Sequence, residues 1–179
     1  MIRAIITHAF KLLATIGIVA LLIGSQMGLA PVALATVTQH EELPGQILFK
    51  AKQTFADRNH YAWQAIAFRQ IYPNRHDDFY LRLVGFPGIV AVDRDRPLIL
   101  KNKKGDSFLA LPDFGELTKN RLSPDLHVGQ YNLEGIVEQL DASVDWQAII
   151  PTENKSERVL EIPGTQIQEW QIAAAAGSR

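Results

Sequence analysis

The stretch FYLRLVGFPGIVAVD, residues 79–93, decides the fold, because it alternates in polarity, breaks at a proline-glycine corner and resumes in aliphatic residues. Such alternation indicates a β-strand that buries one face. Proline pre-sets the second position of a type II turn, and glycine accepts the positive φ of the third. The stretch therefore predicts two strands, 79–84 and 89–92, joined as a hairpin by a turn over residues 86–89.

The same signals recur on both sides of this stretch. Further runs of strand character occupy residues 45–55, 61–72, 98–101, 107–111, 143–150 and 158–162. The turns between most of them are short and polar, which indicates antiparallel hairpins and not crossover connections. We predict a mainly β domain, with α+β as its margin. It should be an antiparallel β-sandwich or partly open barrel of about seven or eight strands.

Two helices complete the predicted fold. Residues 132–140 place apolar side chains on one face after Asn132, a plausible helix cap, and so predict one short internal helix. A C-terminal helix is expected from residue 165, because Thr165 and Gln168 have the spacing of a capping box. The predicted core consists of inward strand residues and one residue that docks the final helix: Ile47, Phe49, Trp63, Phe68, Phe79, Leu81, Leu83, Trp146, Ile150 and Trp170.

Residues 1–35 have the features of a secretory signal peptide. Arg3 and Lys11 give a positive start, an apolar run follows, and the Ala-Leu-Ala sequence at 33–35 is a signal-peptidase site. An uncleaved membrane anchor is the alternative, since residues 12–35 are long enough to span a bilayer. The cleavage site favours an exported protein that begins at Thr36 and has no stable membrane insertion afterwards.

After the signal peptide we predict an exposed lead-in (36–44), a single β-rich domain (45–173) and a frayed tail (174–179). The sequence contains no cysteine, so the core must stabilise the domain without disulfides. Cleavage removes two basic residues and no acidic one, which moves the net charge from −1 to about −3. So mild a charge gives no electrostatic signature of nucleic-acid binding.

Candidate chemistry is sparse. His76-Asp77-Asp78 is the densest set of potential metal ligands, but it lacks the carboxylate spacing of a calcium loop and fits a solvated turn. No serine lies in a nucleophile motif, and no glycine-rich phosphate loop occurs. The sequence therefore assigns no catalytic, cofactor-binding or metal-binding residue, and it predicts no cofactor.

Two segments are candidates for binding a protein partner. Residues 113–131 form the longest irregular stretch, in which Phe114, Leu117 and Leu122 lie among charged residues, as in a small interaction patch. Phe86 is the second candidate, because an exposed aromatic side chain on a rigid turn makes a good anchor. The alternatives are structural: the leucines would cap an open end of the sandwich, and the turn needs no ligand.

Five segments together resemble a family of small exported cyanobacterial proteins of unknown function: ELPGQILFKAKQTF, HYAWQAIAFRQI, FYLRLVGFPG, VGQYNL and IQEWQ. LVGFPG and the late QEW are the most specific of them. The resemblance implies export to the periplasm or the thylakoid lumen, and it transfers no catalytic residue.

Two classes of function stay open. In the first, the chain is a binding or accessory protein that docks on a complex on or near a membrane, such as a photosynthetic complex. In the second, it is a small periplasmic hydrolase or ligand-binding enzyme, with a site assembled from residues distant in sequence.

Overall fold

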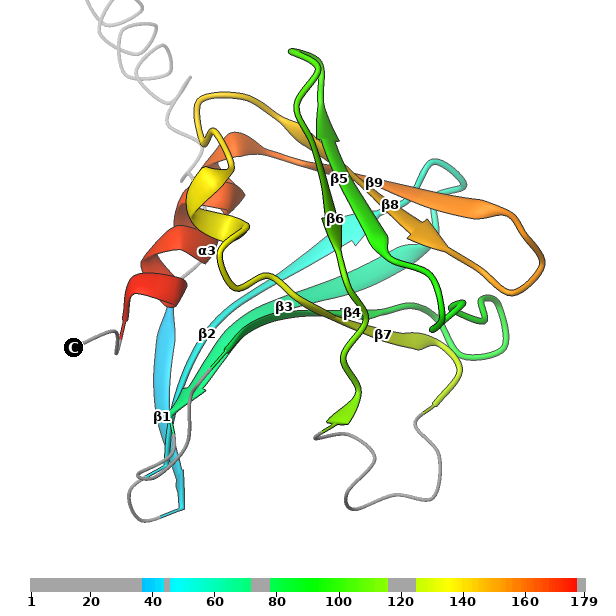
Figure 1. Cartoon of the computed structure of the whole chain (residues 1–179). Helices are drawn as coiled ribbons and strands as arrows, with labels where there is room; N and C mark the ends of the chain where they lie inside the picture. The colour runs from blue at the N-terminus through cyan, green and yellow to red at the C-terminus, as the bar shows by residue number, and fades with distance from the viewer. Residues whose placement is uncertain (1–36, 44–45, 72–77, 116–124, 177–179) are drawn as a thin grey trace, which may run out of the picture. The chain divides into compact units, whose positions relative to one another are not determined.

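The computed structural model describes residues 37–43, 46–71, 78–115 and 125–176. In these ranges the chain forms two antiparallel sheets and a C-terminal helix (Figure 1). None of the helices described is long and apolar enough to cross a bilayer.

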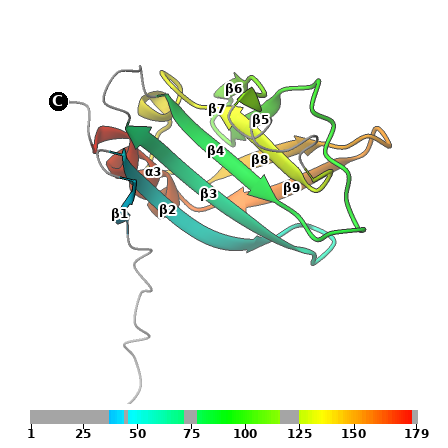
Figure 2. The ribbon, with the colours of Figure 1, turned by 90° about the horizontal axis from the view of Figure 1, so that it is seen from below.

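The first sheet is built mostly from consecutive hairpins, and its strand order is β1-β2-β3-β4-β7. Its strands are β1 (Thr38–Leu43), β2 (Gln46–Ala56), β3 (Ala62–Ile71), β4 (Phe79–Val84) and β7 (Val128–Asn132). The second sheet has the order β6-β5-β8-β9, with β5 (Leu98–Asn102), β6 (Ser107–Ala110), β8 (Trp146–Pro151) and β9 (Glu157–Ile162). Figure 2 shows β2, β3 and β4 in front of the second sheet.

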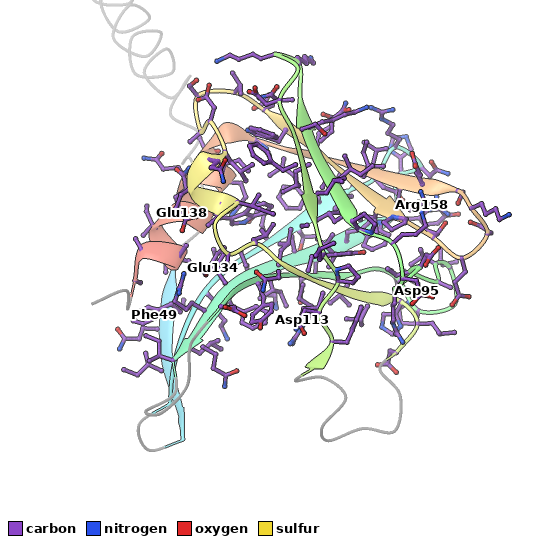
Figure 3. All side chains as sticks on the ribbon, in the orientation of Figure 1. Phe49, Asp95, Asp113, Glu134, Glu138 and Arg158 are labelled. Atoms are coloured by element: carbon purple, nitrogen blue, oxygen red, sulfur yellow. The ribbon has the colours of Figure 1, made fainter. Side chains whose placement is uncertain are left out.

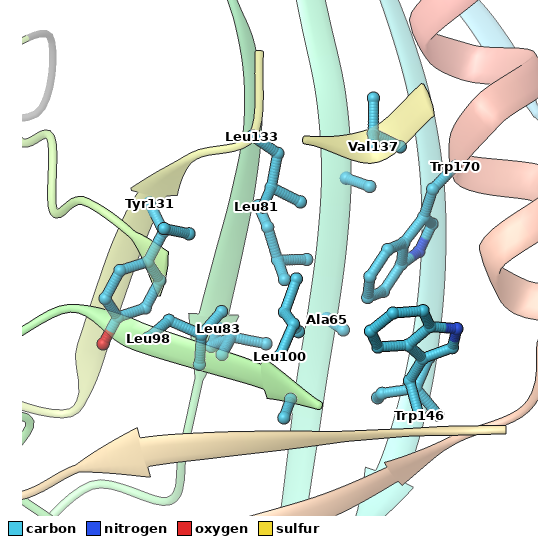
Figure 4. Close-up of a cluster of buried hydrophobic side chains, with 14 of the residues drawn as sticks. Ala65, Leu81, Leu83, Leu98, Leu100, Tyr131, Leu133, Val137, Trp146 and Trp170 are labelled. Atoms are coloured by element: carbon cyan, nitrogen blue, oxygen red, sulfur yellow. The ribbon is translucent and has the colours of Figure 1, made fainter. Parts of the chain in front are cut away.

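The inward faces of the two sheets enclose the hydrophobic core (Figure 4). Alternation along β4 buries every second side chain, including Leu81 and Leu83, and β5 buries Leu98 and Leu100 in the same way. Isolated bridges, Asp57 to Leu160 and Pro112 to Tyr131, join the two sheets without closing a barrel. The predicted fold class, a mainly β antiparallel sandwich, is confirmed.

The C-terminal helix α3 (Gly164–Ala175) packs against β2, β3 and the short 3-10 helix η1 (Val137–Gln139). Trp170 docks it in the core with only 1% of its surface exposed, as predicted. The predicted capping box is wrong, because the helix begins one residue earlier, after Pro163. Its first N–H, on Gly164, donates to Asp145 Oδ1 at 3.1 Å instead.

Two members of the predicted core are only half-buried, Ile47 and Phe49, whereas Leu48 between them is buried. The start of β2 extends beyond the strands of the second sheet (Figure 1), so the inward face of the first sheet is incompletely covered there. Alternation alone assigned these residues to a face, and how much of that face is covered depends on the other sheet.

Three further elements differ from the prediction. Residues 38–43, which show no alternation, pair with β2 as β1, because backbone hydrogen bonds recruit them. Residues 128–131 of the expected irregular segment, together with Asn132, the expected helix cap, pair with β4 as β7. The internal helix is only the 3-10 turn η1, with Gly135 at a φ of +71° just before it.

Candidate functional site

The segment 85–93, in which the sequence predicted half of a hairpin, connects the two sheets at the end opposite α3. The predicted hairpin is wrong, because residues 89–92 do not pair with β4, and Val92 only bridges to Thr152. Four backbone hydrogen bonds hold the segment: Gly85 N–H to His127 O, Val92 N–H to Leu126 O, Asp93 N–H to Pro151 O, and Glu153 N–H to Ala91 O, all between 2.8 and 3.0 Å. The segment is therefore anchored to residues 126–127, just before β7, and to the end of β8 and the turn that follows it.

The predicted turn itself is present. The N–H of Ile89 donates to the carbonyl of Phe86 at 3.2 Å, and Gly88 has a φ of +78°, as the third position of a type II turn requires. Gly85 before it is closely packed, since an added Cβ would lie 2.4 Å from Val90 Cγ1. The backbone before the turn is therefore packed so closely that position 85 has no room for a side chain.

Three large apolar side chains are exposed at this end of the domain. Phe86 is 60% exposed, Ile89 44% and Leu126 55%. Phe86 and Ile89 belong to the turn. Leu126 lies just before β7, and its carbonyl accepts the N–H of Val92. We call Phe86, Ile89 and Leu126 the apolar corner.

A pocket of about 430 Å³ lies beside the apolar corner. Ile89, Val90 and Leu126 form its apolar part, and the polar part comes from His127 and from the β8–β9 hairpin, which contributes Thr152, Glu153, Asn154, Ser156 and Arg158. Arg158 is labelled in Figure 3, on β9 at the end of the domain away from α3. Residues from three distant parts of the sequence thus meet at one site.

Arg158 is held in place by the first sheet. Its guanidinium lies 3.6 Å from Asp57 Oδ2 and 5.4 Å from the centre of the Tyr61 ring. Asp57 is itself fixed, because its carboxylate accepts the backbone N–H groups of Asn59 and Tyr61 and the indole N–H of Trp63. A positive charge is therefore positioned at the pocket, with 16% of the side chain exposed.

The hydroxyl groups of Thr152 and Ser156, which line the pocket, make hydrogen bonds within the β8–β9 turn. Thr152 Oγ1 lies 2.6 Å from Asn154 Oδ1 and 2.8 Å from the carbonyl of Ser156, and Ser156 Oγ donates to Asn154 Oδ1 at 2.6 Å. Lys155 adopts a φ of +61° at the tip of the turn. These bonds define the shape of the pocket wall.

The structure places Phe114 close to the segment that carries Leu126. Phe114 is half-buried, and the guanidinium of Arg94 lies 5.2 Å from its ring centre and donates to the carbonyl of Asp125. Leu117 and Leu122 lie outside the described residues. Within the predicted segment 113–131, Arg94 therefore connects Phe114 to Asp125, and Gly85, next to Phe86, donates to the carbonyl of His127.

The sequence missed Arg158, Tyr61 and Thr152, because nothing in their local pattern indicates that β9, β3 and β8 meet the Phe86 turn. The candidate metal ligands His76 and Asp77 also lie outside the described residues. In the ranges that are described, no three histidine, aspartate or glutamate side chains come together as a metal site.

Comparison with known proteins identifies the family and no individual relative. Neither the curated proteins nor the solved structures include a match. A family model described as "Protein of unknown function (DUF3122)" matches residues 35–172, which cover almost all of both sheets and α3. The chain belongs to this family of proteins of unknown function.

Proposed function

We propose that this chain is an exported accessory protein that binds a partner protein through the apolar corner and the adjoining pocket. The observation that carries the proposal is the exposure of Phe86, Ile89 and Leu126 on a backbone that is hydrogen-bonded to the segment before β7 and to the end of β8. Contiguous apolar side chains rimmed by polar groups are typical of protein interaction sites.

The rigidity of the corner favours binding. An interface made from a preorganised turn loses little conformational entropy when the partner docks. The pocket beside it can accept one side chain of the partner, and Arg158 and His127 offer hydrogen-bond donors at its rim. Small protein interfaces usually combine an aromatic anchor, a pocket that receives a side chain of the partner, and a polar rim.

The sequence of residues 1–35 supports export, since it has the charged start, apolar run and small-residue site of a signal peptide. The match begins at residue 35, next to the predicted cleavage site. With the resemblance to exported cyanobacterial proteins, we propose the periplasm or the thylakoid lumen as the compartment and a membrane-associated complex, such as a photosynthetic one, as the partner. Mass spectrometry of the exported protein tests the cleavage after Ala35. An N-terminus far from Thr36 would contradict it.

Site-specific photocrosslinking in the native host tests the binding site. A benzophenone side chain at position 86 should yield one defined adduct, and the same group at Ile172 on α3, which is 53% exposed, should yield none. Leu126→Ala should weaken the adduct at position 86 while the melting temperature stays unchanged. Equal adducts at the two positions, or an adduct insensitive to Leu126→Ala, would contradict the proposal.

A second candidate is the hydrolase or ligand-binding enzyme, which the size of the pocket favours. Small-molecule sites occupy about 300–1,000 Å³, and the pocket at 430 Å³ lies in that range. Assays of the purified protein with common esters, phosphates and glycosides would separate the two. Turnover of one of these substrates that Arg158→Met abolishes would favour the enzyme. No turnover of any substrate, together with an intact crosslinked adduct at position 86, would favour the accessory protein.

A further inference from the structure

Strand β6 is at the edge of the second sheet, with β5 as its only neighbour among the described strands. In an antiparallel pair, successive residues point their backbone groups alternately toward and away from the neighbour. Asn102 N–H donates to Asp106 O in the β5–β6 hairpin, and Leu111 O accepts the N–H of Asn132 on the other side. By this alternation the N–H and C=O of Leu109 face away from β5.

A cleft of about 490 Å³ lies beside this edge, between Leu109 and Leu111 on one side and Glu134 and Ile136 on the other. The bond from Asn132 N–H to Leu111 O, 2.9 Å long, closes one end of the gap between β6 and the chain after β7. Lys104 Nζ, in the β5–β6 turn, lies 2.7 Å from Asp141 Oδ2, and neither residue lines the cleft. Among the described residues, no backbone hydrogen bond joins β6 to residues 133–136.

The side chains of the edge strand give no protection against strand pairing, although the strand has only four residues and Pro112 follows it closely. Natural edge strands are blunted by charged side chains, prolines or bulges. Residues 107–111, Ser-Phe-Leu-Ala-Leu, contain none of these, and Leu109 and Leu111 are 58% and 67% exposed. These two are the most exposed large apolar side chains of the second sheet and its flanks, and both line the cleft.

The cleft also has a negative charge available. Glu134 is paired with Arg69 at 2.8 Å, but Asp113 makes no ion pair with any described residue. Asp113 is half-buried and lies 3.3 Å from the hydroxyl of Tyr80, whose pKa is raised by burial and by the charges of Asp113 and Asp78. Asp113 and Glu134 are labelled in Figure 3. A cation entering the cleft would meet Asp113.

We propose that this cleft binds an extended segment of a partner protein, which adds to β6 as a further strand and directs a lysine or arginine toward Asp113. The backbone of Leu109 supplies the main-chain hydrogen bonds, and Leu109, Leu111 and Ile136 contact the apolar side chains of the segment. The site is separate from the apolar corner, so the proposal does not depend on the proposed function.

A library of random short peptides displayed on phage, selected against the full chain, provides the probe. Enriched peptides should combine apolar alternation with a lysine or arginine. Leu109→Lys keeps the backbone but places a charge on the edge, so their affinity should fall by about tenfold or more. Asp113→Asn should weaken peptides that contain lysine and leave unchanged the same peptides with norleucine in its place. Ile172→Lys is the matched surface control and should change nothing.

N-methylation of the peptide distinguishes strand addition from a merely apolar contact. Methyl groups on the amides that face β6 should abolish binding, whereas methyl groups on the alternate amides should leave it intact. Equal effects of the two sets, or enriched peptides that bind Leu109→Lys as tightly as the wild type, would overturn the proposal. So would a selection that enriches no peptide. If light scattering shows a dimer that Leu109→Lys dissociates, the occupant of the cleft is a second copy of this chain. That result would overturn the proposal of a partner protein as well.

Discussion

At the scale of single residues, the hydroxyl of Tyr131 is a buried polar group without a hydrogen-bond partner among the described residues. Its ring is fully buried in the core, and burial together with the charge of Asp93 raises the pKa of Tyr131. A buried hydroxyl that makes no bond costs the desolvation free energy of the group. This arrangement could not be predicted from the sequence, since tyrosine hydroxyls usually reach a partner when buried.

Tyr131→Phe should therefore raise the free energy of unfolding, by about 1 kcal/mol. Because the native pKa lies above the unfolded value of 10.0, the unfolded wild type loses its proton first and stability falls as the pH rises through 10. The variant should lose less stability there. Urea titrations at pH 7 and above pH 10 measure both effects. Tyr80→Phe is the control without this gain, because its hydroxyl lies within hydrogen-bonding distance of Asp78 and Asp113.

At the scale of elements, α3 depends on a residue outside its own sequence. Asp145, just before β8, accepts the N–H of Gly164, and Gly164 packs so closely that an added Cβ would lie 2.4 Å from the carbonyl of Ala142. An acceptor at a helix N-terminus satisfies one of the free N–H groups and interacts favourably with the helix dipole. The start of the helix is thus set by its contact with the loop before β8.

Asp145→Ala should lower the free energy of unfolding by about 0.5–2 kcal/mol, the usual cost of losing an N-terminal cap. Thr165→Ala is the matched control, because Thr165 is exposed and the helix has no side-chain cap of its own. Thermal unfolding followed by circular dichroism compares the two variants. A larger loss from Thr165→Ala than from Asp145→Ala would restore the capping box that the sequence predicted.

At the scale of the whole domain, Asp57 links the two sheets. It follows β2, bridges to Leu160 on β9, bonds to Trp63 on β3 and lies beside Arg158. Only 4% of its surface is exposed. Its loss would leave the buried indole N–H of Trp63 unsatisfied and the cation of Arg158 without its partner.

Asp57→Ala should lower the free energy of unfolding by about 3–5 kcal/mol, in the range for breaking a buried charged network. Glu161→Ala is the matched control, because the Arg58–Glu161 pair is more than half exposed on both sides and should contribute less than about 1 kcal/mol. Denaturant unfolding measures both. Similar losses from the two variants would mean that Asp57 does not join the sheets energetically.

The sequence by itself determined the strands that alternate. β2, β4 and β8 were predicted because each presents apolar side chains with a period of two, which depends only on the residues of the strand. β3 was predicted as a run that is apolar on both faces, and β5, β6 and β9 as short apolar runs bounded by turns. The turn at Phe86 was also predicted, since proline and glycine restrict the backbone locally. The exposure of Phe86 agrees with its selection as an anchor.

Only the tertiary structure decided the remaining features, because each depends on chain segments that are distant in sequence. The polar strand β1 forms through its ladder with β2, and β7, in which Gln130 is buried, forms through its ladder with β4. Residues 89–92 have strand composition, yet they form a connection, because Val92 donates to Leu126 before β7 and Asp93 donates to Pro151 on β8. The pocket beside Phe86 and the cleft beside β6 arise where non-consecutive elements meet. No local pattern records which elements will meet, because the packing of the two sheets on one core decides it.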